Sequence, residues 1–217
     1  MSSLPPLSSS GVFSVSASSS IDAPLEKVWS ILLDFPSYKK WQEFNVYFLL
    51  ARSELIFIAS RNSFVYENTP CPEINPLSYF FFDRRSQTVV NASKETIADQ
   101  TPVEGSFLLI KANIPPTMNE PGFLGKSSVF VKVKTIDHIN HRAAWGAEAL
   151  PKFLLHTERW QALSVDEATG RTKYETIEVF SGVLAYFVKF FVGKNLALSF
   201  QAGADCLKKC AEGSSPL

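Results

Sequence analysis

The C-terminal run from Phe180 to Glu212 constrains the fold more than any other part of the sequence. Its apolar residues recur at helical spacing, with Leu196, Phe200 and Leu207 in one stripe, while the charged side chains fall mostly off that stripe. The pattern predicts a long amphipathic helix whose apolar face needs a large concave partner. Because the segments before it look like strands, we expect that partner to be a curved sheet.

Alternation of apolar and polar residues predicts strands in much of the remaining chain. Phe13 to Ala17 alternates with serines. Two further strands, His156 to Val165 and Thr172 to Phe180, are joined by a hairpin loop that ends at Gly170. Sequential strands with short turns imply an antiparallel sheet.

Two short helices are expected after the first strand. Asp22 can cap the first of them, and Pro24 is tolerated in its first turn because no N–H is needed there. Pro36 ends this helix, and a second helical turn carries Trp41 and Phe44 on one side. A strand, two helices, a sheet and a long final helix form an α+β pattern.

The domain organisation predicted from the sequence is one domain, residues 13–212, between disordered tails at 1–12 and 213–217. Within this domain, 45–87 holds apolar clumps without a steady period, and an irregular stretch this long is uncommon in a compact domain. One interpretation is an extra hairpin or lid over the interior. The other is a retained intron, since Val46 needs a codon that begins with GT and Gln87 can be encoded by CAG.

Charge and composition narrow the function classes. The formal net charge of +0 gives no electrostatic case for nucleic acid. The three cysteines favour free thiols, and the N-terminus lacks the basic and apolar regions of a signal peptide, so we expect a cytoplasmic protein. We expect no metal and no cofactor, because the sequence has neither a glycine-rich phosphate loop nor a set of ligands at metal-binding spacing.

The most apolar run, Val183 to Val192, is interrupted by Lys189. It is shorter than the roughly 20 residues that a helix needs to span a bilayer. Peripheral contact with a membrane stays open as an alternative for this run.

The segment from Ile21 to Trp41, with its Ala-Pro pair, Val-Trp pair and Asp-Phe ending, resembles the opening of the START-like superfamily in its polyketide cyclase/dehydrase branch. Three later pieces are also similar to this family, namely Pro102 to Gly105, His156 to Trp160 and Phe180 to Leu184. The resemblance extends over 13–44 and about 89–212 and skips the irregular segment between them.

This resemblance implies a helix-grip fold, in which an antiparallel sheet of roughly seven strands curls around the C-terminal helix and leaves a cavity between them. Members of the superfamily bind lipids, sterols, polyketides or other apolar molecules, and a few are enzymes. The motifs that carry the resemblance are specific for the fold and poor indicators of function.

A candidate site follows from the alternation in the last hairpin. His156, Glu158 and Trp160 share one face of their strand, and Tyr174 lies on the neighbouring strand. If this face looks inward together with Trp145, the interior has an aromatic wall and a His–Glu pair. That pair could perform general acid–base chemistry, or it could be a hydrogen-bonded pair that only positions the rim. The remaining residues expected to line the ligand site are Trp41, Phe44, Phe187 and Phe191.

The function expected from the sequence is therefore binding of a hydrophobic small molecule (a lipid, a sterol or a polyketide-like compound) by a carrier or binding protein. One alternative is a polyketide cyclase or dehydratase that uses His156 and Glu158 as its catalytic residues. The other is an interaction module related to co-chaperone domains of the same superfamily. An inward His–Glu pair would favour the enzyme, and exposed apolar patches would favour the interaction module.

Overall fold

The computed structural model describes residues 11–38, 87–113, 126–147 and 149–213. The elements in these ranges are, in chain order, β1 (Phe13–Ile21), α1 (Leu25–Leu33), the 3-10 helix η1 (Phe35–Ser37), β2 (Gln87–Val90), β3 (Phe107–Asn113), β4 (Lys126–Asp137), β5 (Arg142–Ala147), β6 (His156–Val165), β7 (Thr172–Ser181) and α3 (Leu184–Ala211). Of the predicted site residues, Trp41 and Phe44 lie outside the described ranges, as does 45–86 of the irregular segment.

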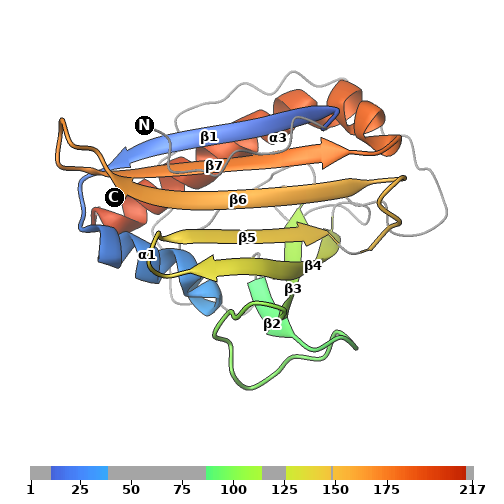
Figure 1. Cartoon of the computed structure of the whole chain (residues 1–217), viewed down its shortest axis with the longest axis horizontal. Helices are drawn as coiled ribbons and strands as arrows, with labels where there is room; N and C mark the ends of the chain where they lie inside the picture. Colours follow the sequence, from blue (N-terminus) through green and yellow to red (C-terminus); the bar gives the residue numbers. More distant parts are fainter. Residues whose placement is uncertain (1–10, 39–86, 114–125, 148, 214–217) are drawn as a thin grey trace, which may run out of the picture.

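The seven strands of the described chain form one antiparallel sheet in the order β1-β7-β6-β5-β4-β3-β2. Each strand from β2 to β7 pairs with its neighbour in sequence, and β1 joins the sheet beside β7 (Figure 1). The sheet is curved, and α3 packs on it at the edge formed by β1 and β7. This arrangement confirms the predicted α+β, helix-grip fold with two short helices after the first strand. The second of them is the 3-10 turn η1, which contains Pro36, while the predicted turn that carries Trp41 and Phe44 lies outside the described ranges.

The predicted apolar stripe of the final helix is the face that α3 turns toward the sheet. Leu196, Phe200, Ala204 and Leu207 are all buried there. Their partners lie on β1, β7 and α1. The helix begins at Leu184, a few residues after the start of the apolar run, because Gly182 makes a turn with a φ of 93° between β7 and α3.

The start of α1 differs from the expectation. Asp22 does not cap the helix with its side chain; the residue before the first helical turn is Pro24. Instead, the backbone N–H of Asp22 donates to a carboxylate oxygen of Glu212 at 2.8 Å. The beginning of the domain is thus tied to the end of α3. The apolar residues Val28, Trp29 and Leu32 of α1 are buried as predicted.

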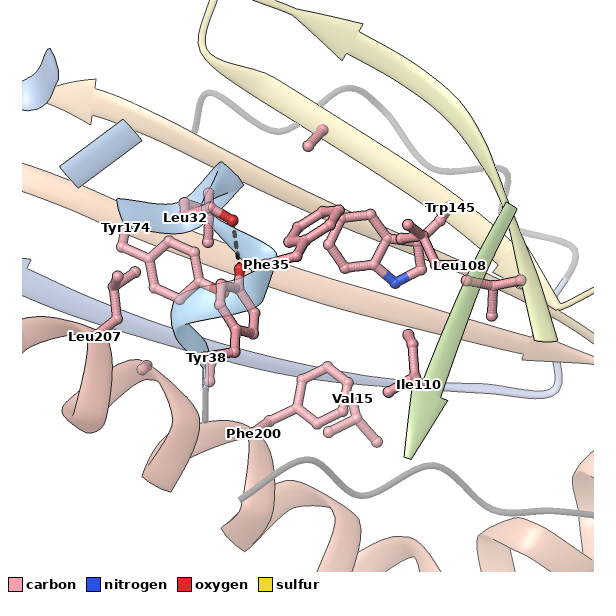
Figure 2. Close-up of a cluster of buried hydrophobic side chains, with 14 of the residues drawn as sticks. Val15, Leu32, Phe35, Tyr38, Leu108, Ile110, Trp145, Tyr174, Phe200 and Leu207 are labelled. Carbon is pink, nitrogen blue, oxygen red and sulfur yellow. Dashed lines mark hydrogen bonds between the residues drawn. The ribbon is translucent and has the colours of Figure 1, made fainter. Parts of the chain in front are cut away.

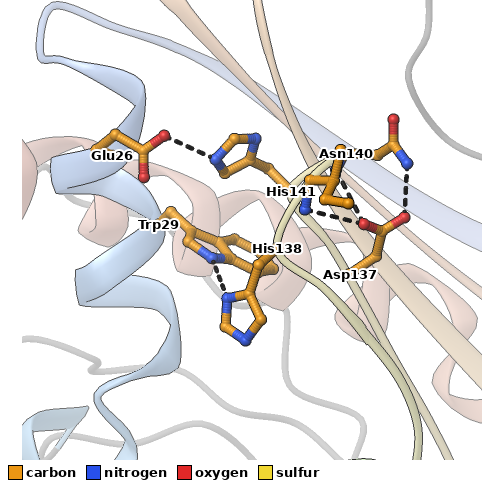
Figure 3. A network of polar contacts seen from close by, with 7 residues as sticks. Glu26, Trp29, Asp137, His138, Asn140 and His141 are labelled. Atoms are coloured by element: carbon orange, nitrogen blue, oxygen red, sulfur yellow. Dashed lines mark hydrogen bonds and ion pairs between the residues drawn. The ribbon is translucent and has the colours of Figure 1, made fainter.

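The turn between β4 and β5 contacts α1 through two histidines (Figure 3). The indole Nε1 of Trp29 donates to His138 Nδ1 at 3.1 Å, and the ring of Trp29 meets the rings of His138 and His141 edge-on. His141 Nε2 lies 3.0 Å from a carboxylate oxygen of Glu26. Because Asp137 accepts three hydrogen bonds from the turn itself, both histidines are held against the helix.

A cluster of buried hydrophobic side chains, several of them aromatic, lies between the sheet and the helices (Figure 2). Phe35 lies edge-on to Tyr38 and to Trp145, with ring centroids 5.5 and 6.1 Å apart. The hydroxyl of Tyr38 donates to the backbone carbonyl of Leu32, which fixes the 3-10 turn against α1. Trp145 is therefore held at the middle of the sheet by residues of the short helices.

β2 packs against η1, although 49 positions separate Tyr38 from Gln87 in the sequence (87 − 38 = 49). Residue 38, at the end of one described range, and residue 87, at the start of the next, therefore lie close together. The end point of the predicted irregular segment is shifted by one residue, because Gln87 is the first residue of β2.

Candidate functional site

The inner face of β6 and β7, which looks toward α3, carries polar side chains in an otherwise apolar interior. Arg159 lies directly opposite Glu178 in the register of the two strands, and Gln161 lies opposite Thr176. All four are buried. Val15 of β1 is the next partner of Glu178 in the register, and Trp145 of β5 is the next partner of Arg159. The polar residues are therefore bordered by apolar side chains on both sides.

Arg159 is 7% exposed and is held by contacts from α3 and β7. Its guanidinium carbon lies 4.2 Å from the centroid of the Phe200 ring of α3, which is a cation–π distance. Its Nε donates to the hydroxyl of Thr176 at 3.2 Å, and that hydroxyl donates to the carbonyl of Trp160 at 3.0 Å. The guanidinium is thus fixed in one place below the helix.

Glu178 is 1% exposed, and its Oε2 has no hydrogen-bond partner among the residues that the structure describes. Removal of the carboxylate from water raises the pKa of Glu178 to about 7, although the positive charge of Arg159 and a hydrogen bond from Thr157 act in the opposite direction. Buried polar atoms are satisfied in most proteins, so the unpaired Oε2 of Glu178 calls for an explanation.

The inner face of the sheet also carries a hydrogen-bonded pair, Tyr174 and Gln161, and another buried acceptor, on Gln87. The hydroxyl of Tyr174 donates to Oε1 of Gln161 at 2.5 Å, and burial raises the pKa of this tyrosine. On β2, Gln87 is buried, and within the described chain its Oε1 also finds no partner. The register through β3 and β4 places Gln87 on the same face as Trp145.

The structure corrects the placement of His156, Glu158 and Trp160. They share one face of β6, as predicted, but it is the outer face, because Thr157, Arg159 and Gln161 between them are the buried residues. Trp145 and Tyr174 do face inward. The expected common face is therefore split between the two sides of the sheet.

On the outer face, Glu158 is part of a surface ion pair. Its Oε2 lies 2.5 Å from Nζ of Lys134, and its Oε1 accepts a 2.7 Å hydrogen bond from the indole of Trp160. Partial burial acts to raise the pKa of Glu158, but these two hydrogen bonds outweigh it and hold that pKa below its usual value. Lys134 crosses over Gly146, where a Cβ would lie only 2.8 Å from Cε of the lysine.

Phe187 and Phe191 are also placed differently from the expectation. Both are about half exposed, on the side of α3 that faces away from the sheet. The inward residues of the same helix turns are Ala185 and Val188. Neither phenylalanine faces the polar residues of β6 and β7.

Within the described ranges, no group of three or more His, Cys, Asp or Glu side chains could hold a metal ion. Cys206 and Cys210 of α3 form no disulfide within the described chain, and burial raises the pKa of Cys210 despite the nearby charge of Lys27. No helix of the described chain is both long enough and apolar enough to cross a bilayer.

These inward polar residues were not predicted, because the face of β6 that carries His156, Glu158 and Trp160 was expected to look inward. The signal that could have found them is the hairpin register. Counting back from the loop at 166–170 pairs Val165 with Thr172, and the same count places Arg159 opposite Glu178. Two opposite charges directly across an antiparallel pair are a stabilising combination that can be read from sequence.

Comparison with known proteins identifies the fold. No protein-family model matches the chain, and no curated protein matches it. Among solved structures, a hypothetical protein from Helicobacter pylori superimposes with a TM-score of 0.59 and 13% identity, over 94% of this chain and 91% of that protein. A protein from Thermus thermophilus gives a TM-score of 0.54 and 12% identity, over 94% and 99% of the two chains. At these identities the likeness shows the fold alone.

Proposed function

We propose that this protein is a START-like protein, similar to the polyketide cyclase/dehydrase branch, that binds a hydrophobic small molecule between the inner face of its sheet and α3. The ligand would be a lipid, a sterol or a polyketide-like compound. The protein would act as a carrier or binding protein for it.

The observation that carries this proposal is the buried polar set on the inner face of β6 and β7. A core that served only stability would gain little from Arg159 and Glu178, since two charged groups buried opposite each other are often no better than apolar residues of the same size. Ligand sites, by contrast, are mostly apolar and contain a few fixed polar groups that orient the ligand. Trp145, Phe200 and Val15 supply the apolar part here.

The polar set also has an open position. Oε2 of Glu178 is an acceptor without a partner in the described chain, and the adjacent guanidinium is fixed by Phe200 and Thr176. An apolar molecule that carries one polar group would satisfy this acceptor. His156 and Glu158 would not reach such a molecule, because they lie on the outer face of the sheet, so the geometry favours binding over the catalytic alternative.

The experiment compares two tryptophans in delipidated protein. Trp145 lies on the inner face and Trp160 on the outer face, so Trp145→Phe and Trp160→Phe are matched variants. Fatty acids, sterols and aromatic polyketides are titrated while tryptophan emission and the melting temperature are followed. A ligand specific for the folded state should stabilise it by about 2.7 kcal/mol at a hundredfold excess over Kd.

We expect the emission change to persist in Trp160→Phe and to be largely lost in Trp145→Phe, with the melting temperature of both variants still raised by the ligand. Loss of the signal in Trp160→Phe alone would place the ligand on the outer face and contradict the proposal. The absence of any shift with every compound class would also contradict it.

A further inference from the structure

The first half of α3 is apolar on both of its sides. Its inward side is buried against the sheet through Ala185 and Val188. Its outward side exposes several large residues besides Phe191, and these recur at helical spacing, namely Val183, Tyr186, Phe187 and Phe190. A helix that is apolar all round is normally covered by protein or by lipid. Phe190 is 84% exposed, so nothing in the described part of the chain covers this side.

The loop before β6 extends the exposed surface. The backbone N–H groups of Val183 and Leu184 donate to the carbonyls of Phe153 and Leu154, at 3.1 and 2.9 Å. Gly182 makes this close approach possible, since a Cβ there would lie 2.7 Å from the carbonyl oxygen of Leu154. Phe153, itself 75% exposed, is thereby fixed beside the start of the helix. We call Phe153, Val183, Tyr186, Phe187 and Phe190 the aromatic surface.

The charged side chains in the first half of α3 are all positive. Lys189 and Lys194 are both exposed, and the sequence from Leu184 to Ala204 contains no Asp or Glu. Tyrosine is favoured at the level of lipid head groups because its ring is amphipathic, and phenylalanine is common on the buried apolar face of helices that lie in the membrane interface. Lysines beside an apolar helix face are attracted to anionic lipids. A helix that combines these features binds the membrane surface and lies parallel to it.

We propose that the aromatic surface docks the protein on the surface of an anionic lipid bilayer, with the phenylalanines at the boundary between head groups and acyl chains and Lys189 and Lys194 at the head groups. This interaction does not depend on the ligand inside the fold. It uses the outer side of α3, while the proposed ligand site uses the side that faces the sheet.

The test is sedimentation of the full chain with phosphatidylcholine vesicles that contain or lack phosphatidylserine. The protein should bind the vesicles with phosphatidylserine, and added salt should weaken binding because it screens the lysines. Phe190→Glu should weaken binding about tenfold or more, since it removes a ring that the bilayer buries on binding and adds a negative charge that the anionic lipids repel. Lys189→Gln and Lys194→Gln should each weaken it about fivefold.

Ile139→Glu is the matched control. Ile139 is 88% exposed, close to the value for Phe190, but it lies in the β4–β5 turn at the opposite end of the sheet (Figure 1). Vesicle binding of this variant should be weakened by no more than about fivefold, which is the effect of one added negative charge at the membrane. If Phe190→Glu lowers the melting temperature, Phe190→Ser and Tyr186→Ser replace it, because both positions are exposed.

Three results would overturn the proposal. The wild type could fail to bind phosphatidylserine vesicles, or Ile139→Glu could weaken binding as much as Phe190→Glu. Sedimentation equilibrium without lipid could also show a dimer that Phe190→Glu dissociates, and the aromatic surface would then be an interface between two copies of this chain. Vesicle binding can fail while the Trp145 titration succeeds, so the two proposals are tested separately.

Discussion

The guanidinium of Arg159 lies 4.2 Å from the centroid of the Phe200 ring, so the sheet and the C-terminal helix meet at a buried charge. The helix residue is part of the apolar stripe, and the strand residue is opposite Glu178 in the register. The contact therefore joins the structural core to the polar set that we assign to the ligand. Its energetics can be measured without knowledge of the ligand.

Glu178 should make the stability of the fold fall as the pH rises. Its pKa is raised to about 7 in the folded state, so the folded chain holds a proton that the unfolded chain has already released. The stability contributed by this proton is fully present below the usual carboxyl pKa and is lost as the pH rises through about 7. The free energy of unfolding should fall by about 3 kcal/mol over this pH range.

Urea unfolding between about pH 5 and about pH 8 measures this dependence. Glu178→Gln should flatten the curve, because the amide resembles the protonated acid and does not titrate. Glu175→Gln, a variant on the outer face of the same strand, should leave the wild-type slope in place. An unchanged slope in Glu178→Gln would show that another group is responsible.

Arg159→Met should be strongly destabilising at neutral pH. The substitution removes the positive charge that lowers the pKa of Glu178, so this buried carboxyl must take up a proton, and it also removes the cation–π contact with Phe200. Loss of one of two charges buried side by side costs up to about 3–5 kcal/mol. The double variant Arg159→Met/Glu178→Leu should recover much of this loss, because apolar residues of similar size often replace such pairs without cost. Arg171→Met, which removes an exposed ion pair with Asp22, should cost less than about 1 kcal/mol. A double variant as unstable as the single one would contradict this account.

The same Leu→Ala substitution at Leu207 and at Leu198 compares the two sides of α3. Leu207 is buried, whereas Leu198 is more than half exposed. Leu207→Ala should lower the free energy of unfolding by about 2–5 kcal/mol, because it leaves a cavity against the sheet. Leu198→Ala should change it by less than about 0.5 kcal/mol. Thermal or urea unfolding measures both, and equal losses would mean that α3 does not pack as described.

Replacement of 46–86 by a short Gly/Ser linker should leave the fold intact. The described chain ends at residue 38 beside the place where β2 begins, and a shorter connection has a slightly smaller closure entropy. We expect a cooperative melting transition at an equal or higher temperature. Loss of that transition would mean that the segment supplies part of the core. The same outcome would also argue against a retained intron.

The sequence predicted the elements well where a single pattern was unambiguous. The hairpin loop at 166–170 ends at Gly170 with a φ of 67°, and the strands on either side have the predicted limits within a residue. The stripe of Leu196, Phe200 and Leu207 is buried as predicted. Glycine requirements and helix periodicity are local properties, so they can be read without knowledge of the partner elements.

The face of β6 could not be predicted in this way. One side carries Trp160 and the other carries Leu163 with Arg159, so each face mixes polar and apolar residues. A one-residue error in the choice of face moves every side chain to the other side of the sheet. The first half of α3 posed the same problem, because Phe187 and Val188 are equally apolar and periodicity does not decide which one is buried.

Native mass spectrometry of the purified full chain tests the central claim most directly, because it detects a bound molecule without a choice of ligand. The wild type should carry an additional apolar molecule that organic extraction releases. Arg159→Met/Glu178→Leu should carry less of it or none, while Glu158→Gln on the outer face should carry as much as the wild type. The wild type at its bare sequence mass under gentle ionisation, together with an empty organic extract, would contradict the binding function.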